Sequence, residues 1–296
     1  TAPILGSLSD ATGRRIPFLC FSTITCVIFT SLLGIGGIYV SLIFFVFANY
    51  MFQTGLIFYD SLLPSLTTVK NRGKVGSFGV GIGYLGSLIG AGIGVLWFDE
   101  LGRIGMFRIT GFLFLIFAIP CFIFVKEQNA ARSRLNFHIL TSYYTQLKST
   151  YLKARQIKGV TRFLIGRMFY ADAMNTLIMF IGIYVTNELG LSDKTLQMIL
   201  MLSIVAAILG APVWGVLVDS VGPKKSLDMV LYIWMFVLIG ASAIPIFNLP
   251  NYLIWMIAPL SGIAMGGVWC ADRPYLIRLV PEHAIGEFFG LYSLVG

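Results

Sequence analysis

Long apolar runs limit, more than any other feature, how this chain can fold. Each run holds about 20 residues with few charges, the length an α-helix needs to cross the hydrocarbon core of a bilayer. The runs cover residues 16–35, 38–63, 77–98, 104–125, 161–186, 195–217, 226–247 and 252–278. Helices satisfy their backbone polar groups internally, so they can lie in hydrocarbon. The sequence therefore predicts an all-α integral membrane protein with eight complete spans.

The composition agrees with this fold class. Of the 296 residues, 57% are hydrophobic and 11% are charged, whereas about 25% of residues are charged in a soluble domain. Residues 1–5 read as the end of an earlier helix, and residues 288–296 as the start of a later one. We therefore expect two partial spans and a chain truncated at both ends.

Basic residues are concentrated in alternate connecting segments. These segments contain Arg14, Arg15, Lys70, Arg72, Lys74, residues 126–162, Lys224, Lys225 and Arg278. The segments between them are poor in Lys and Arg, so the positive-inside rule places the basic set in the cytoplasm. Topology thus accounts for the net charge of +8. A nucleic-acid partner is not expected, because the basic residues do not form one face interleaved with aromatic residues.

The segment 126–160 is long for a helix connection. It places Leu140, Tyr144, Leu147 and Tyr151 on one helical face, as in an interfacial helix against anionic lipid. A loosely ordered linker is the alternative. The predicted organisation is an N-terminal helix bundle over 1–125, a cytoplasmic linker over 126–160 and a C-terminal helix bundle over 161–296.

One loop pattern occurs twice. Residues 2–15 and 211–225 share the pattern APxxGxLxDxxG followed by basic residues. Glycine permits a tight turn, the aspartate can accept from turn amides or a helix N-terminus, and the basic residues can anchor the loop to the inner leaflet. The residues of these loops are Asp10, Gly13, Arg14 and Arg15 in the first copy and Asp219, Gly222, Lys224 and Lys225 in the second. A charged hairpin that merely obeys the positive-inside rule is the alternative.

A second match follows each copy of the loop. Asp60 with Leu63-Pro64 precedes residues 76–79, and Asp272 with Val280-Pro281 precedes residues 286–290. Parallel repeats joined by a long loop are typical of one class of secondary transporter.

The pattern GxLxDxxGRR of residues 6–15 resembles the signature loop of the major facilitator superfamily. The resemblance covers essentially the whole chain and implies the major facilitator fold, with two six-helix bundles. It also implies that Asp10 helps to latch the two halves on the cytoplasmic side, with Arg14 and Arg15 as its basic partners. Pro223 replaces one basic residue in the second copy, so we expect a weaker latch there.

Residues 163–177, 58–64 and 287–292 are similar to the vacuole-effluxer-like proteins, the family of the autophagy-related amino-acid exporters and their bacterial relatives. This similarity implies a monomer that exports amino acids or related metabolites by alternating access. It implies the cell membrane of a prokaryote, or the vacuolar membrane of a eukaryote. Asp60 and Asp272 stand where small polar residues are expected from the family.

Polar residues inside the apolar runs are candidates for the substrate and proton pathway, because ionisable groups are expensive in hydrocarbon. Asn49, Gln53 and Asp60 share one helical face. In the run 161–186, Arg167 aligns with Tyr170.

Asp172 lies about 140 degrees from Arg167 around the same helix, so these two cannot simply pair. With Asn175 nearby, Asp172 is the leading candidate for a proton-coupling carboxylate. A static interhelical hydrogen bond is the alternative for Asp172.

Asp272 and Arg273 lie near the cytoplasmic end of the run 252–278, with Trp269 one turn before Arg273. They are further pathway candidates. Snorkelling of the arginine into lipid headgroups explains Arg273 equally well.

Residues 81–86 match the nucleotide-binding pattern GxGxxG, but that pattern requires a preceding strand. Glycines at these spacings in an apolar run instead predict close helix contact. No catalytic, metal or cofactor motif is evident, and the two histidines, His138 and His283, lie in predicted cytoplasmic segments. A secondary transporter is therefore favoured over a membrane enzyme or a non-transporting receptor or scaffold. A sugar or drug exporter of the same superfamily is the alternative substrate class.

Overall fold

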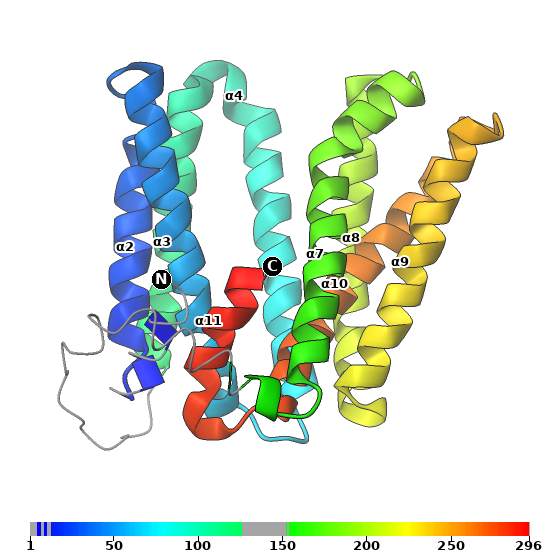
Figure 1. Cartoon of the computed structure of the whole chain (residues 1–296). Helices are drawn as coiled ribbons and strands as arrows, with labels where there is room; N and C mark the ends of the chain where they lie inside the picture. The colour runs from blue at the N-terminus through cyan, green and yellow to red at the C-terminus, as the bar shows by residue number, and fades with distance from the viewer. Residues whose placement is uncertain (1–4, 7–8, 11–12, 126–151, 153, 296) are drawn as a thin grey trace. The chain divides into compact units, whose positions relative to one another are not determined.

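The computed structural model describes residues 5–6, 9–10, 13–125, 152 and 154–295. The described part of the chain is almost entirely helical and contains no strand (Figure 1). The helix predicted around Leu140 to Tyr151 lies outside the described residues.

The helices follow the apolar runs of the sequence. The main ones are α2 (Ile16–Ser31), α3 (Gly37–Leu66), α4 (Arg72–Phe124), α7 (Val160–Ile183), α8 (Asp193–Val221), α9 (Pro223–Ile246), α10 (Ile254–Leu279) and α11 (Ile285–Val295). A π-helical turn, Tyr184–Glu188, extends α7. The 3-10 turns Asn251–Leu253 and Glu282–Ala284 precede α10 and α11.

Within the described residues, six helical segments are long and apolar enough to cross a membrane. Two predicted spans, 77–98 and 104–125, fall in the single element α4, which breaks at Gly102 with φ 61° and ψ −177°. Glycine alone adopts this conformation readily, and Figure 1 shows the chain turning back at the top of α4. Helix α2 has 16 residues, fewer than the roughly 20 that a span needs. The total of eight complete spans therefore stays a prediction.

The structure divides into two compact units whose segments alternate along the chain. Unit 1 comprises Thr1–Leu66, Gly90–Leu164 and Leu279–Gly296, and unit 2 comprises Thr67–Ile89 and Ile165–Arg278. Helix α4 thus contributes to both units. The bundle boundaries expected at residues 125 and 161 stay predictions.

Aromatic packing forms much of the core of unit 1. Phe18 of α2 stacks on Phe58 of α3 with ring centroids 5.4 Å apart, and Leu62 is buried beside them. Helix α11 packs against α3. Tyr292 of α11 stacks on Phe163 at 6.5 Å. These contacts fix the start of α11 close to the first loop.

Tryptophans and small residues shape the core of unit 2. Trp214, Val230, Trp234 and Val268 are buried together. An added Cβ at Gly262 of α10 would overlap the backbone of Ser203 in α8, so these two helices approach backbone to backbone.

The close contact predicted from the glycines of residues 81–86 is not observed at Gly83 or Gly86. A Cβ added at either position would meet no described atom within 4 Å. A small-residue pattern creates a flat helix surface but does not determine what packs against it. A Cβ added at Gly81 would lie 3.8 Å from the Cβ of Ala211, so a helix contact is seen at one of these glycines and stays a prediction at the other two.

Candidate functional site

The carboxylate of Asp10 caps the start of α11. Its Oδ1 accepts a hydrogen bond from the Gly286 N–H at 3.0 Å, and its Oδ2 accepts one from the Glu287 N–H at 2.9 Å. The first N–H groups of a helix have no partner inside the helix, and a negative charge there also interacts favourably with the helix dipole. The hydrogen bonds to a helix N-terminus predicted for Asp10 are therefore present.

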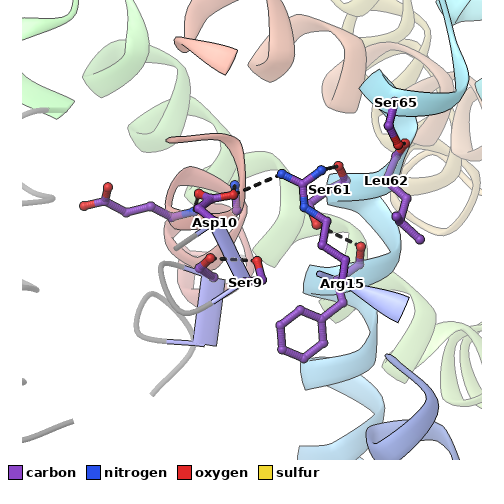
Figure 2. Close-up of polar contacts among 10 residues, drawn as sticks. Ser9, Asp10, Arg15, Ser61, Leu62 and Ser65 are labelled. Atoms are coloured by element: carbon purple, nitrogen blue, oxygen red, sulfur yellow. Dashed lines mark hydrogen bonds and ion pairs between the residues drawn. The ribbon is translucent and has the colours of Figure 1, made fainter. Parts of the chain in front are cut away.

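Arg15 connects this cap to α3. Figure 2 shows its guanidinium lying between Asp10 and Ser61. Nη2 contacts Asp10 Oδ1 at 3.0 Å, and Nη1 donates to the Ser61 carbonyl oxygen at 2.7 Å. Arg14, in contrast, is exposed. The expected pairing of Arg15 with Asp10 is therefore present.

The cap is partly shielded from water, since the side chains of Asp10 and Arg15 are 10% and 17% exposed. Burial raises the pKa of the Asp10 carboxyl above its ordinary value. The hydrogen bonds from Glu287 and Arg15 oppose that rise in the pKa by stabilising the charged form. The donors of the cap therefore lower the pKa of Asp10 from where burial alone would place it.

Two glycines let the loop approach α11 closely. An added Cβ at Gly6 would overlap the carbonyl oxygen of Gly286. An added Cβ at Gly286 would lie 2.6 Å from the Gly6 oxygen and 2.7 Å from Asp10 Oδ1. Gly6, the first glycine of the repeated pattern, thus allows the amides at the start of α11 to come within hydrogen-bond distance of Asp10.

The second loop repeats this geometry within unit 2. Asp219 accepts from the N–H of Gly73 at 2.6 Å and from the N–H of Lys74 at 2.9 Å, at the start of α4. Gly215 occupies the motif position of Gly6, and its carbonyl oxygen would lie 2.7 Å from a Cβ added at Gly73. The two loops therefore cap two helix starts in the same way.

The two copies differ in their basic residues. Lys224 and Lys225 are exposed, and no ion pair to Asp219 is found among the described residues. Gly13 and Gly222 have φ values of 62° and 95°, which confirms the predicted tight turns. The strength of the second latch relative to the first stays a prediction.

The contacts of the two aspartates also correct the alignment of the second pair of matching segments. The sequence comparison paired residues 76–79 with 286–290, whereas the structure makes Gly73 and Lys74 equivalent to Gly286 and Glu287. The predicted match was therefore displaced by three residues in its first copy. Apolar membrane segments resemble one another at several registers, and the aspartate contacts select one.

We expect Gly6→Ala to destabilise the protein by about 1–3 kcal/mol, because its Cβ would meet backbone, which side-chain rotation cannot relieve. Gly83→Ala is the matched control, since a Cβ there meets nothing within 4 Å. Thermal unfolding of the purified variants in detergent measures the difference. Equal unfolding temperatures for the two variants would show that the close approach at Gly6 is absent.

A buried ion pair joins α7 to α10 within unit 2. Arg167 Nη1 donates to Asp272 Oδ2, and their side chains are 5% and 0% exposed. Tyr170 lies on the same face of α7 as Arg167, with its hydroxyl 3.5 Å from the same carboxylate oxygen. The sequence aligned Arg167 with Tyr170 but did not identify Asp272 as their partner.

Arg273 is the residue after Asp272, and its side chain lies over a tryptophan of its own helix. Its Cζ lies 5.3 Å from the ring centroid of Trp269, one turn earlier in α10. A guanidinium at this distance from an indole is stabilised by a cation–π interaction.

The other predicted pathway residues are not gathered at this ion pair. Asn49 and Gln53 are exposed on α3, whereas Asp60 is buried near the C-terminal end of that helix. Asp172 and Asn175 are exposed on α7. The structure thus brings together Arg167, Tyr170 and Asp272, whereas Asp172 is exposed on the same helix as Arg167.

The described residues contain six helices long and apolar enough to cross a membrane, together with a repeated loop whose aspartate caps a helix start, as in a polytopic membrane protein built from an internal repeat. The model of the Major Facilitator Superfamily matches residues 1–296, so the chain belongs to this superfamily. It is therefore a multi-pass membrane transporter. The family resemblance of residues 6–15 is confirmed.

Known relatives agree. The chain is 27% identical over 308 residues to the uncharacterized MFS-type transporter YxiO of Bacillus subtilis (strain 168), covering 99% of this chain and 70% of that protein. It is 22% identical over 257 residues to autophagy-related protein 22-1 of Aspergillus fumigatus, covering 76% of this chain and 41% of that protein. The predicted similarity to the vacuole-effluxer-like proteins is thus confirmed.

The fold is also similar to a solved structure. A crystal structure of a bacterial homologue of the iron transporter ferroportin, in an outward-facing state, matches with a TM-score of 0.62 and 17% sequence identity. The match covers 99% of this chain and 78% of that one. At this identity the likeness concerns the fold alone.

Proposed function

We propose that this transporter is a proton-coupled exporter of amino acids or related small metabolites that works as a monomer. The observation that carries the mechanism is the pair of matching caps, Asp10 on α11 and Asp219 on α4. The substrate class is supported by the similarity to autophagy-related protein 22-1 and by the vacuole-effluxer-like segment 163–177.

The caps suit alternating access, in which two bundles rock around a central site. Each cap links a loop of one proposed bundle to a helix start of the other. Asp10 belongs to the proposed bundle 1–125 and caps α11 of the proposed bundle 161–296. Asp219 belongs to 161–296 and caps α4 of 1–125. The links made by the two aspartates are hydrogen bonds and one ion pair, which can break and re-form. The caps therefore hold the cytoplasmic side closed in one state and release it in the other.

The coupling carboxylate must exchange protons with water. Asp172 is exposed on α7, whereas Asp272 is fully buried and paired with Arg167. Asp172 is therefore the proposed proton carrier, and Arg167 with Asp272 fixes α7 against α10.

Efflux from proteoliposomes tests this function. Vesicles loaded with radiolabelled amino acids, sugars or an uncharged drug are given a pH gradient, with protein-free vesicles as the blank. We expect gradient-dependent efflux of at least one amino acid. Asp172→Asn should retain downhill movement and lose the response to the gradient. Movement of sugars or drugs alone would contradict the amino-acid assignment, and movement of no solute would contradict transport.

A further inference from the structure

Basic residues from three separate parts of unit 2 lie close to the second loop. The contacts of Asp219 with the amides of Gly73 and Lys74, at 2.6 and 2.9 Å, place the start of α4 beside this loop. A Cβ added at Gly222 would lie 3.3 Å from Arg278 Nη1, which places the end of α10 there as well. Helix α9 begins directly after Gly222. The residues brought together in this way, here called the basic cluster, are Lys70, Arg72, Lys74, Lys224, Lys225 and Arg278.

The basic cluster forms an exposed, positively charged surface. Five of its six residues are exposed, and Arg72 is half-buried, with its Nε donating to Thr67 Oγ1 at 3.3 Å. The acidic residues of the loop and of the first turns of α9 are Asp219 and Asp228. Asp219 already accepts from two backbone amides. Asp228 is exposed one turn after Lys224. Basic residues therefore outnumber acidic ones by three to one at this surface.

The first loop has the same cap geometry but a different charge pattern. When the two caps are aligned, Lys74 at the start of α4 corresponds to Glu287 at the start of α11. In the first loop, moreover, Arg15 is paired with Asp10. The positive-inside rule applies to both loops alike. The concentration of basic residues at the second loop therefore has a cause besides topology.

An exposed apolar stripe on α9 begins beside the basic cluster. Its residues, Met229, Tyr232, Phe236 and Ile239, are 44–70% exposed. They lie within a sector of about 80 degrees around the helix axis, and Lys225 lies in the same sector. Ile239 is about 21 Å along the helix from Lys225. Basic residues at the end of an apolar membrane surface lie at the level of the lipid phosphates. The cluster and the stripe therefore match the headgroup and the acyl chains of a phospholipid.

We infer that the basic cluster binds the headgroups of anionic phospholipids whose acyl chains lie against the apolar stripe of α9. A soluble anion would use the same charges but would leave the stripe without a partner. The inference goes beyond amino-acid export, because lipid binding is measurable whether or not any solute is transported. It assigns the second loop a lipid site that the first loop does not share.

Native mass spectrometry of the purified protein in detergent counts the bound lipids directly. The protein is titrated with dioleoyl phosphatidylglycerol or with dioleoyl phosphatidylcholine, which share their acyl chains and differ in headgroup charge. We expect the first phosphatidylglycerol to bind about tenfold or more tightly than the first phosphatidylcholine, because only the former carries a net negative charge. Inorganic phosphate in excess should not displace the phosphatidylglycerol.

Two double variants remove charge from different segments of the basic cluster. Lys224→Gln with Lys225→Gln removes two charges at the start of α9, and Lys74→Gln with Arg278→Gln removes one from α4 and one from α10. Each basic residue near an anionic lipid surface contributes about fivefold to binding. Each double variant should therefore weaken phosphatidylglycerol binding by about 10- to 30-fold and leave phosphatidylcholine binding unchanged.

Arg155→Gln with Lys158→Gln is the matched control, because it removes two exposed charges from a predicted cytoplasmic segment of unit 1. It should leave phosphatidylglycerol binding unchanged, and equal weakening by this control would show that any cytoplasmic charge serves.

Equal affinity for the two lipids, or displacement of phosphatidylglycerol by inorganic phosphate, would overturn the lipid as the partner. Unchanged binding in either double variant of the cluster would overturn a site formed by all three segments. Failure of amino-acid efflux would leave these results intact, so the two proposals are tested separately.

Discussion

Asp272→Asn should destabilise the protein by about 3–5 kcal/mol, the range for removing one partner of a buried ion pair. The substitution preserves side-chain shape, so the effect reports the charge that Arg167 would lose. Arg167 is 5% exposed and cannot recover this interaction from water without moving. Equilibrium unfolding of the purified protein in mixed micelles with increasing SDS measures the change in free energy.

Two control variants distinguish loss of the ion pair between Arg167 and Asp272 from loss of a carboxylate in general. Asp172→Asn removes an exposed carboxylate from α7 and should change stability by no more than about 0.5 kcal/mol. The double variant Arg167→Met with Asp272→Leu should be more stable than either single variant, because no unpaired charge is left buried. Additive losses in the double variant would contradict the pairing of these residues.

Asp10→Asn should speed amide hydrogen exchange at the start of α11 by about 10- to 100-fold. A hydrogen bond to a charged group is worth about 1.5–3 kcal/mol, and each 1.4 kcal/mol of opening free energy changes exchange about tenfold. Asparagine would present an NH₂ group to an N–H donor or to Arg15, so at least one of these contacts would be lost. Exchange measured on peptides that cover 285–289 reports the effect.

Asp219→Asn is the matched variant for this experiment. It should speed exchange in peptides that cover 72–76 and leave those of 285–289 unchanged, since each aspartate caps one helix start. The effect at α11 should exceed that at α4, because Asp10 also pairs with Arg15. Equal acceleration of both regions by either variant would show general loosening instead of two local caps.

The helices and the repeated loop could be predicted from the sequence because their causes are local. Apolar runs located the helices, and the pattern around Asp10 and Asp219 indicated acids that accept from helix amides. Gly13 and Gly222 likewise marked turns that require a positive φ. Neighbouring residues determine the helices and the turns, whereas the helix that each aspartate caps lies far away in the chain.

The partners of these residues could not be predicted, because they depend on which helices pack together. Arg167 and Asp272 are 105 residues apart. Helical periodicity placed each on a face of its own helix without showing that the faces meet. The glycines of residues 81–86 show the same limit. They predicted a flat helix surface, but they did not predict which helix packs against it. The register of the second repeat was also ambiguous until the Asp219 contacts aligned Gly73 with Gly286.

The most direct test of proton-coupled export is the reciprocal measurement, in which the solute drives the protons. Coupling between two ligands is symmetric in free energy. Proteoliposomes that contain a pH-sensitive dye are diluted into an amino-acid gradient with no initial pH gradient. Proton-coupled export predicts a change of luminal pH that depends on the amino acid and disappears in Asp172→Asn. Amino-acid movement without any change of luminal pH in the wild-type protein would contradict it.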